Sequence, residues 1–262
     1  MVTAALFGLL STSLASIDLV EAAHNFRHRA AVTSPQVADP ITRSDHVALL
    51  IANSNYPDAD ATMADVTAGA DTLANILSRH GFFVIVVRDA TRGEVMEAIE
   101  RLKAVARPGS VVLVYFGGFG VQSGGQNYMI PVDAKIWQES DVRRDGVKIE
   151  RALSDLSASG ARIQIAIVDA SRRNPYERRF RNYSHGLAPI DASANTIVIT
   201  STSPRQVVDE AGVSLNCFVN GLAAEITQSS RSLEEVFAAR AATRNRREQE
   251  HSKSAMESSE NC

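Results

Sequence analysis

The chain has 262 residues, of which 45% are hydrophobic, so it is long enough to bury one large core. Its formal net charge of -3 gives no basic excess over a whole face, and we therefore expect no nucleic-acid partner. Two cysteines, Cys217 and Cys262, provide neither a disulfide framework nor a zinc site, so we expect no metal and no other cofactor.

The first residues are expected to form a separate segment. An apolar run over residues 4–10 is followed by small side chains that suit a processing enzyme, so residues 1–23 have features of an export signal. Against this, no lysine or arginine precedes the run. With such a signal the protein would be periplasmic or secreted, and otherwise cytoplasmic. The run is too short to span a bilayer, so we expect no stable membrane span, and residues 24–44 are expected to form a polar, proline-broken linker.

From residue 46 onward, buried strands are predicted to alternate with amphipathic helices. The predicted strands cover residues 46–52, 82–87, 111–116, 163–169 and 196–200. Apolar residues at helical spacing predict helices over residues 70–77, 95–105, 148–156, 217–226 and from 232 onward. This alternation predicts an α/β fold with a mainly parallel sheet and helices on both faces.

Local signals mark several ends of these elements. His80 and Gly81 form a C-terminal stop for the first helix, and Thr91 with Glu94 forms a capping box for the second, which Pro108-Gly109 is expected to close. Residues 127–132 are predicted as a short hairpin or an edge strand, because Pro131 cannot donate to a ladder. The sequence does not identify a partner for this segment.

Two of the predicted strands end in segments that suit a functional site. The strand over residues 111–116 runs into three glycines around Phe119, where the backbone must turn sharply or approach something closely. The strand over residues 163–169 ends at Asp169 and is followed by Ser171. Chemistry in α/β sheets usually lies at such carboxyl ends of strands.

Neither segment carries a common nucleotide or serine-hydrolase motif. The glycines around Phe119 lack the spacing of the nucleotide fingerprints, and no Lys-Ser or Lys-Thr follows them. Ser171 is flanked by Ala170 and Arg172, whereas a serine nucleophile elbow requires Gly-x-Ser-x-Gly.

An ordered series of segments carries a more specific resemblance. In chain order these are HVALLIANSNY, AGADTLANILSRHGFFV, VYFGGFG, NYMIPVDA, IVDASRRNP, GLAPIDA, TSPRQVVDE and SLEEVF. The series resembles the caspase-like peptidases, in particular the bacterial metacaspase or orthocaspase type of the p20 domain, over residues 45–259. The resemblance implies a caspase-like α/β fold and descent from cysteine-type endopeptidases.

The resemblance also implies that both catalytic residues are replaced. The family's histidine position holds Phe119, and its cysteine position holds Ser171. Peptide cleavage by this design needs a thiolate that attacks the carbonyl and an imidazole that manages the protons, and a phenyl ring has no titratable nitrogen. We therefore expect a proteolytically inactive pseudopeptidase that binds a peptide or protein partner in the remains of the substrate groove.

The substrate pocket is expected to be degenerate as well. Relatives that cleave after arginine or lysine use two aspartates, of which Asp169 matches one, while Gly69 stands at the position of the other. Asp65 or Asp71 could substitute in space. The resemblance places the backbone donors of the oxyanion hole at Gly120 and Ser171.

Other readings of these residues stay open. Phe119 could simply fill the space of the histidine by packing, and Asp169 could pair with Arg172 or Arg173. An active or residual endopeptidase directed at arginine or lysine would use Ser171 or another nucleophile; for Ser171, His185 of a downstream loop is the candidate base. A third possibility is a structural module without a groove ligand.

Overall fold

The computed structural model describes residues 44–57, 63–170, 176, 186–205, 216–243 and 246. All of them lie in one compact unit of the chain, Val32–Cys262. The predicted export signal, nearly all of the predicted linker, His185 and Ser171 lie outside the described residues.

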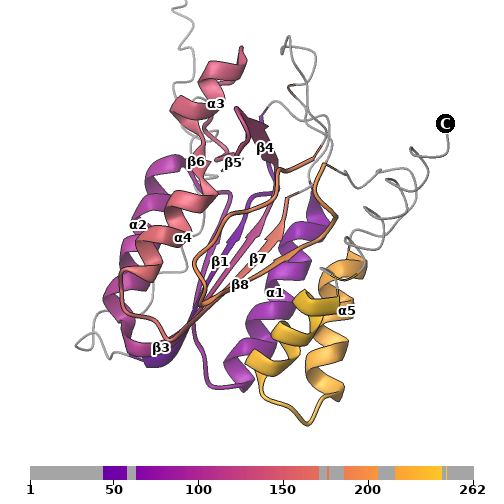
Figure 1. Ribbon diagram of the computed structural model, residues 1–262. Helices are drawn as coiled ribbons and strands as arrows, with labels where there is room; N and C mark the ends of the chain where they lie inside the picture. Colours follow the sequence, from indigo (N-terminus) through magenta and orange to yellow (C-terminus); the bar gives the residue numbers. More distant parts are fainter. Residues whose placement is uncertain are drawn as a thin grey trace, which may run out of the picture. The chain divides into compact units, whose positions relative to one another are not determined.

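The core of the fold is a five-stranded sheet in which every neighbouring pair is parallel (Figure 1). The strand order is β2-β1-β3-β7-β8. The strands are β1 (Ser44–Ala52), β2 (Phe83–Arg88), β3 (Ala106–Gly117), β7 (Ile163–Asp169) and β8 (Thr196–Thr200). All five predicted strands and the parallel arrangement are thereby confirmed.

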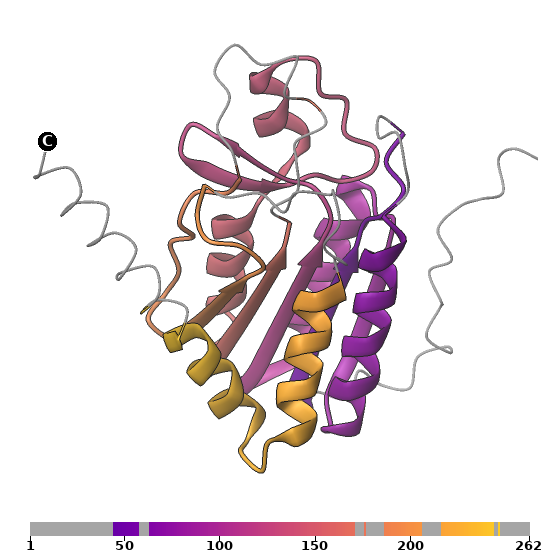
Figure 2. The same ribbon diagram turned by 90° about the vertical axis from the view of Figure 1, so that its right-hand side faces the viewer.

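Helices cover both faces of this sheet, as predicted. On one face lie α1 (Ala64–Arg79), α5 (Asn216–Gln228) and a helix over residues 233–243, and on the other lie α2 (Arg92–Val105) and α4 (Ile149–Ser157) (Figures 1 and 2). None of the described helices is both long enough and apolar enough to cross a bilayer.

The strands alternate their side chains between two cores. Leu50, Leu113 and Ile167 pack with α1 and α5, whereas Leu49, Val112 and Val168 pack with α2 and α4. Because the central strands are covered on both sides, their sequences are continuous apolar runs without polar alternation.

The predicted helix ends are largely confirmed. The Glu94 N–H donates to Thr91 Oγ1 at 3.3 Å and the Thr91 N–H donates to Glu94 Oε2 at 2.8 Å, which completes the capping box. Helix α1 ends before Gly81, whose φ of 80° is favourable only for glycine. The expected close of α2 at Pro108-Gly109 is wrong: α2 ends at Val105, and residues 106–110 already belong to β3. A register shift opposite β1 accommodates these extra residues.

A second, antiparallel sheet was only partly predicted. It contains β4 (Gly120–Ser123), β5 (Gln126–Met129) and β6 (Val147–Lys148) in the order β4-β5-β6. The edge-strand alternative for residues 127–132 is wrong, because β5 is central and ends before Pro131. The hairpin alternative is correct, with β4 as the partner and a Gly124-Gly125 turn at positive φ. Helix α3 (Glu139–Asp145) precedes β6 and was not predicted.

Candidate functional site

The backbone joins the two strand ends that the sequence singled out. Gly117, the last residue of β3, lies opposite Asp169, the last residue of β7. Beyond the strands, the Gly118 N–H donates to the Asp169 carbonyl at 3.3 Å and the Gly120 N–H donates to the Ala170 carbonyl at 2.9 Å. The glycine loop around Phe119 therefore lies beside the end of β7, while Ser171 itself lies outside the described residues.

Phe119 is a core side chain. Phe119 is only 5% exposed and belongs to the apolar cluster on the α1 side of the sheet. The ring lies against Tyr56, with the two centroids 4.7 Å apart and the ring planes tilted by 55°. At the place where the family resemblance puts an imidazole, the chain therefore has a buried aromatic contact.

Tyr56 holds the backbone of Phe119 in place. Its hydroxyl accepts a hydrogen bond from the Phe119 N–H at 3.0 Å and donates one to the Ile130 carbonyl at 2.9 Å. The Ile130 N–H in turn donates to the Phe119 carbonyl at 3.0 Å. Sequence reasoning did not identify Tyr56 as a site residue, since only its place in the Asn-Tyr-Pro turn after β1 distinguishes it.

The loop after β1 is itself fixed by two polar side chains. Asn53 accepts from the Ala90 N–H through Oδ1 at 2.9 Å and donates through Nδ2 to the Ile130 carbonyl at 3.2 Å. The Asp89 carboxylate accepts the N–H groups of Ser54 and Asn55 at 2.8 and 2.9 Å. Tyr56 is thus positioned by a preorganised turn.

All three glycines of the loop have close neighbours, and an added Cβ at Gly117 would lie 2.5 Å from the Tyr115 hydroxyl oxygen. A Cβ at Gly118 would lie 2.5 Å from the Tyr56 hydroxyl oxygen, and the φ of 151° at this residue disfavours any other side chain. A Cβ at Gly120 would lie 2.8 Å from the Cβ of Ala170. The approach of the loop to Ala170, directly after β7, therefore requires glycine at position 120, and the contact with Tyr56 requires glycine at position 118.

The predicted acidic pocket is only partly present at the ends of β3 and β7. Asp169 is buried at the end of β7, beside the glycine loop. Gly69 lies in α1 and faces α5, where an added Cβ would be 3.2 Å from Cγ2 of Val219. Asp71 is bonded to Arg88 of β2, so this carboxylate already has a cationic partner. Of the two predicted pocket positions, the structure places only Asp169 at the two strand ends.

The described residues provide no metal-ion site, and a cavity among them lies away from the glycine loop. No group of three or more histidine, cysteine, aspartate or glutamate side chains there could hold a metal ion. A cavity of about 820 Å³ lies beside β8, between α5 and the helix over residues 233–243. Phe119, Gly120 and Asp169 are not among its lining residues.

Comparison with known proteins identifies the family. A family model described as the caspase domain matches residues 45–260. Over 146 residues, the chain is 29% identical to the human mucosa-associated lymphoid tissue lymphoma translocation protein 1 and 28% identical to its mouse homolog. These alignments cover 54% of this chain, and the chain spans only 17% of the length of each of these relatives.

Solved structures show the same fold. The Drosophila initiator caspase Dronc is similar with a TM-score of 0.52 and 10% sequence identity, covering 74% of this chain and 72% of that one. The caspase-like α/β fold is therefore confirmed. Because the family model covers most of the sequence, we conclude that this chain belongs to the caspase-domain family.

Proposed function

We propose that this caspase-domain protein is proteolytically inactive and acts by binding or regulation. The observation that carries the proposal is Phe119, which occupies the family's histidine position as a buried ring packed on Tyr56. Attack on a peptide carbonyl requires a base to accept the nucleophile's proton and an acid to protonate the leaving amine. A phenyl ring performs neither step.

The hydrogen bonding of the glycine loop supports the same proposal. The Gly120 N–H, which the family resemblance assigns to the oxyanion hole, donates to the Ala170 carbonyl at 2.9 Å. A substrate oxyanion would have to share this donor or displace the carbonyl. Stabilisation of the developing negative charge depends on donors that are aimed at the substrate oxygen, so this contact would weaken it.

The ligand of this proposed binding protein is a peptide or protein segment in the remains of the substrate groove at the ends of β3 and β7. Within the family, we assign the chain to the bacterial metacaspase or orthocaspase type, on the ordered motifs that extend from HVALLIANSNY to SLEEVF. Export through residues 1–23 belongs to the same proposal. It predicts that N-terminal sequencing of protein purified from its own cells begins after that segment.

Reporter hydrolysis tests the loss of activity directly. The purified chain is incubated with fluorogenic peptides carrying arginine or lysine at the scissile bond, between about pH 5 and pH 9. We expect no hydrolysis above that of Ser171→Ala, the matched control. Turnover that disappears in Ser171→Ala would overturn the proposal and support a divergent serine peptidase. A fluorophosphonate probe gives a second readout, since it labels only an activated serine, and we expect no adduct on Ser171.

Restoring the family residues tests the cause of inactivity. The double variant Phe119→His with Ser171→Cys is compared with Ser171→Cys alone. If the missing imidazole limits catalysis, only the double variant gains hydrolysis. Equal activity in the two variants would show that the histidine position is not the reason.

A further inference from the structure

An exposed tryptophan stands apart from the site described above. Trp137 is the only tryptophan of the chain, and it is 71% exposed, more than the other exposed large apolar residues that the structure describes, Phe83 and Met96. Exposed indole rings have a large apolar surface, and tryptophan is enriched among the residues that dominate binding energy at protein interfaces. The exposure of Trp137 therefore indicates a candidate binding surface.

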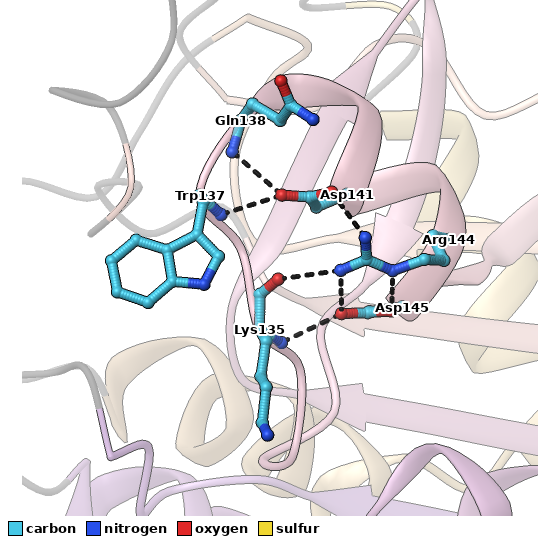
Figure 3. Close-up of polar contacts among 6 residues, drawn as sticks. All are labelled: Lys135, Trp137, Gln138, Asp141, Arg144 and Asp145. Atoms are coloured by element: carbon cyan, nitrogen blue, oxygen red, sulfur yellow. Dashed lines mark hydrogen bonds and ion pairs between the residues drawn. The ribbon is translucent and has the colours of Figure 1, made fainter.

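The backbone that carries this ring is held by a buried carboxylate. The N–H groups of Trp137 and Gln138 both donate to Asp141 Oδ2 at 3.1 Å, and the Asp141 side chain is only 6% exposed (Figure 3). These backbone bonds, with that of Trp137 the stronger, and the charge of Arg144 hold the pKa of Asp141 below its usual value. The carboxylate is thus charged at neutral pH and anchors the loop to α3.

A second carboxylate, that of Asp145, binds the same loop at Lys135, two residues before Trp137. Asp145 accepts the Lys135 N–H at 3.0 Å and binds Arg144 through both oxygens, at 2.7 and 2.9 Å. Arg144 also donates to the Lys135 carbonyl at 3.2 Å and to Asp141 at 2.8 Å. The indole is therefore presented on a preorganised loop, which lowers the entropy lost when a partner binds.

A small cavity adjoins this loop. It has a volume of about 310 Å³ and is lined by Arg92, Asp133, Ala134, Lys135, Arg144 and Asp145. These side chains comprise three cations and two carboxylates, so the lining is positive on balance.

Two of these cations are available to a ligand. Asp145 is neutralised by Arg144, and Asp133 accepts the backbone N–H of Arg92 at 2.8 Å. In the part of the chain that the structure describes, the side chains of Arg92 and Lys135 form no hydrogen bond or ion pair. The hydrogen bond and charge of Arg144 hold the pKa of Asp145 below its usual value, and the charge of Arg92 acts on that carboxyl only as a minor addition. Figure 3 shows the Lys135 ammonium and the Trp137 ring directed away from the Asp141–Arg144 network.

We propose that Trp137, Arg92 and Lys135 form a docking site for an acidic peptide segment of a partner protein, separate from the groove at the ends of β3 and β7. An apolar side chain of the segment packs on the indole, and a neighbouring carboxylate is bound by the guanidinium and the ammonium. Charge-assisted hydrogen bonds of this kind fix register, while the apolar contact contributes most of the affinity.

The single tryptophan makes the test direct. The full chain is titrated with a capped pentapeptide of alternating glutamate and leucine, and the emission of Trp137 is recorded. We expect a saturable blue shift, because the ring leaves water on binding. The same peptide with lysine in place of glutamate is expected to cause no shift. An unchanged spectrum up to millimolar peptide, or an equal shift with the lysine peptide, would overturn the proposal.

Variants assign the binding to these residues. Arg92→Gln combined with Lys135→Gln is expected to raise the peptide dissociation constant at least tenfold. The control combines Lys103→Gln of α2 with Arg151→Gln of α4, two cations that do not line the cavity, and is expected to leave the constant unchanged. Trp137→Ala is followed by the anisotropy of a labelled peptide and should weaken binding to a similar extent. Equal affinity in the first pair and the control pair would refute the site. Ser171→Ala is expected to bind the peptide with unchanged affinity. The docking test is therefore independent of the test for proteolytic activity, and either proposal can be refuted without the other.

Discussion

Phe119→Ala tests whether the ring at the histidine position is a core residue. The substitution removes a phenyl group that is almost completely buried and in contact with Tyr56. Truncation of a buried phenylalanine to alanine costs about 3–5 kcal/mol, because apolar transfer energy is lost and a cavity remains. For a domain of this size, each kcal/mol lowers Tm by roughly 2–4 °C, so we expect a decrease of roughly 6–20 °C.

The assays are thermal denaturation, which gives Tm, and urea denaturation, which gives the free energy of unfolding, both followed by circular dichroism, with Phe83→Ala as the matched control. Phe83 has the same side chain on β2 but is 46% exposed, so its truncation should cost about 1 kcal/mol or less. Phe119→Leu keeps most of the apolar volume and is expected to cost less than half as much as Phe119→Ala. If Phe119→Ala destabilises the protein no more than Phe83→Ala does, the ring is not part of the core, and the main support for the proposed function is lost.

Three further predictions concern the same two regions. Tyr56→Phe leaves the Phe119 N–H without its partner, while the Ile130 carbonyl keeps its bond from Asn53; it should lower the free energy of unfolding by about 1–3 kcal/mol in urea titrations, and no change would mean that this hydroxyl does not hold the glycine loop. Gly118→Ala should destabilise the fold by more than about 2 kcal/mol because of its contact with the tyrosine hydroxyl, whereas Gly93→Ala, with open space around it, should be neutral or slightly stabilising. Asp141 has a folded pKa below its unfolded value, so its contribution to stability is complete at neutral pH and is lost as the pH falls through the acid range below about pH 4. Trp137 emission should report this acid transition, and Asp141→Asn should reduce its amplitude to the part that depends on Asp145, whose pKa is also lowered, chiefly by its hydrogen bond with Arg144; an identical titration in that variant would contradict the assignment.

Most of the central sheet could be predicted from local patterns. The segments that form β1, β3 and β7 are continuous apolar runs because helices cover both of their faces. Burial on both faces can therefore be predicted from the sequence. The capping box at Thr91 and Glu94 is equally local, since its two partners are three residues apart. Such signals need no knowledge of distant contacts.

The small sheet and its helix were not accessible in this way. Strands β4 and β6 are four and two residues long, too short for a periodic pattern, and they are stabilised by pairing with β5. Helix α3 likewise has only seven residues, and its N-terminus depends on Asp141 bonding to the backbone before it. Pairing across the chain decided these elements where local propensity was weak.

The candidate site likewise combines features that the sequence shows with features that only the folded structure shows. Which residues stand at positions 119 and 171, and hence the absence of an imidazole and a thiol, is a matter of sequence alone. That the ring at position 119 is buried on Tyr56, and that the Gly120 N–H is used by Ala170, follows only from contacts between segments far apart in the chain. Side-chain chemistry is a property of each residue, whereas burial and hydrogen-bond partners are properties of the folded arrangement, so the sequence determined which groups are present and the tertiary structure decided what each of them contacts.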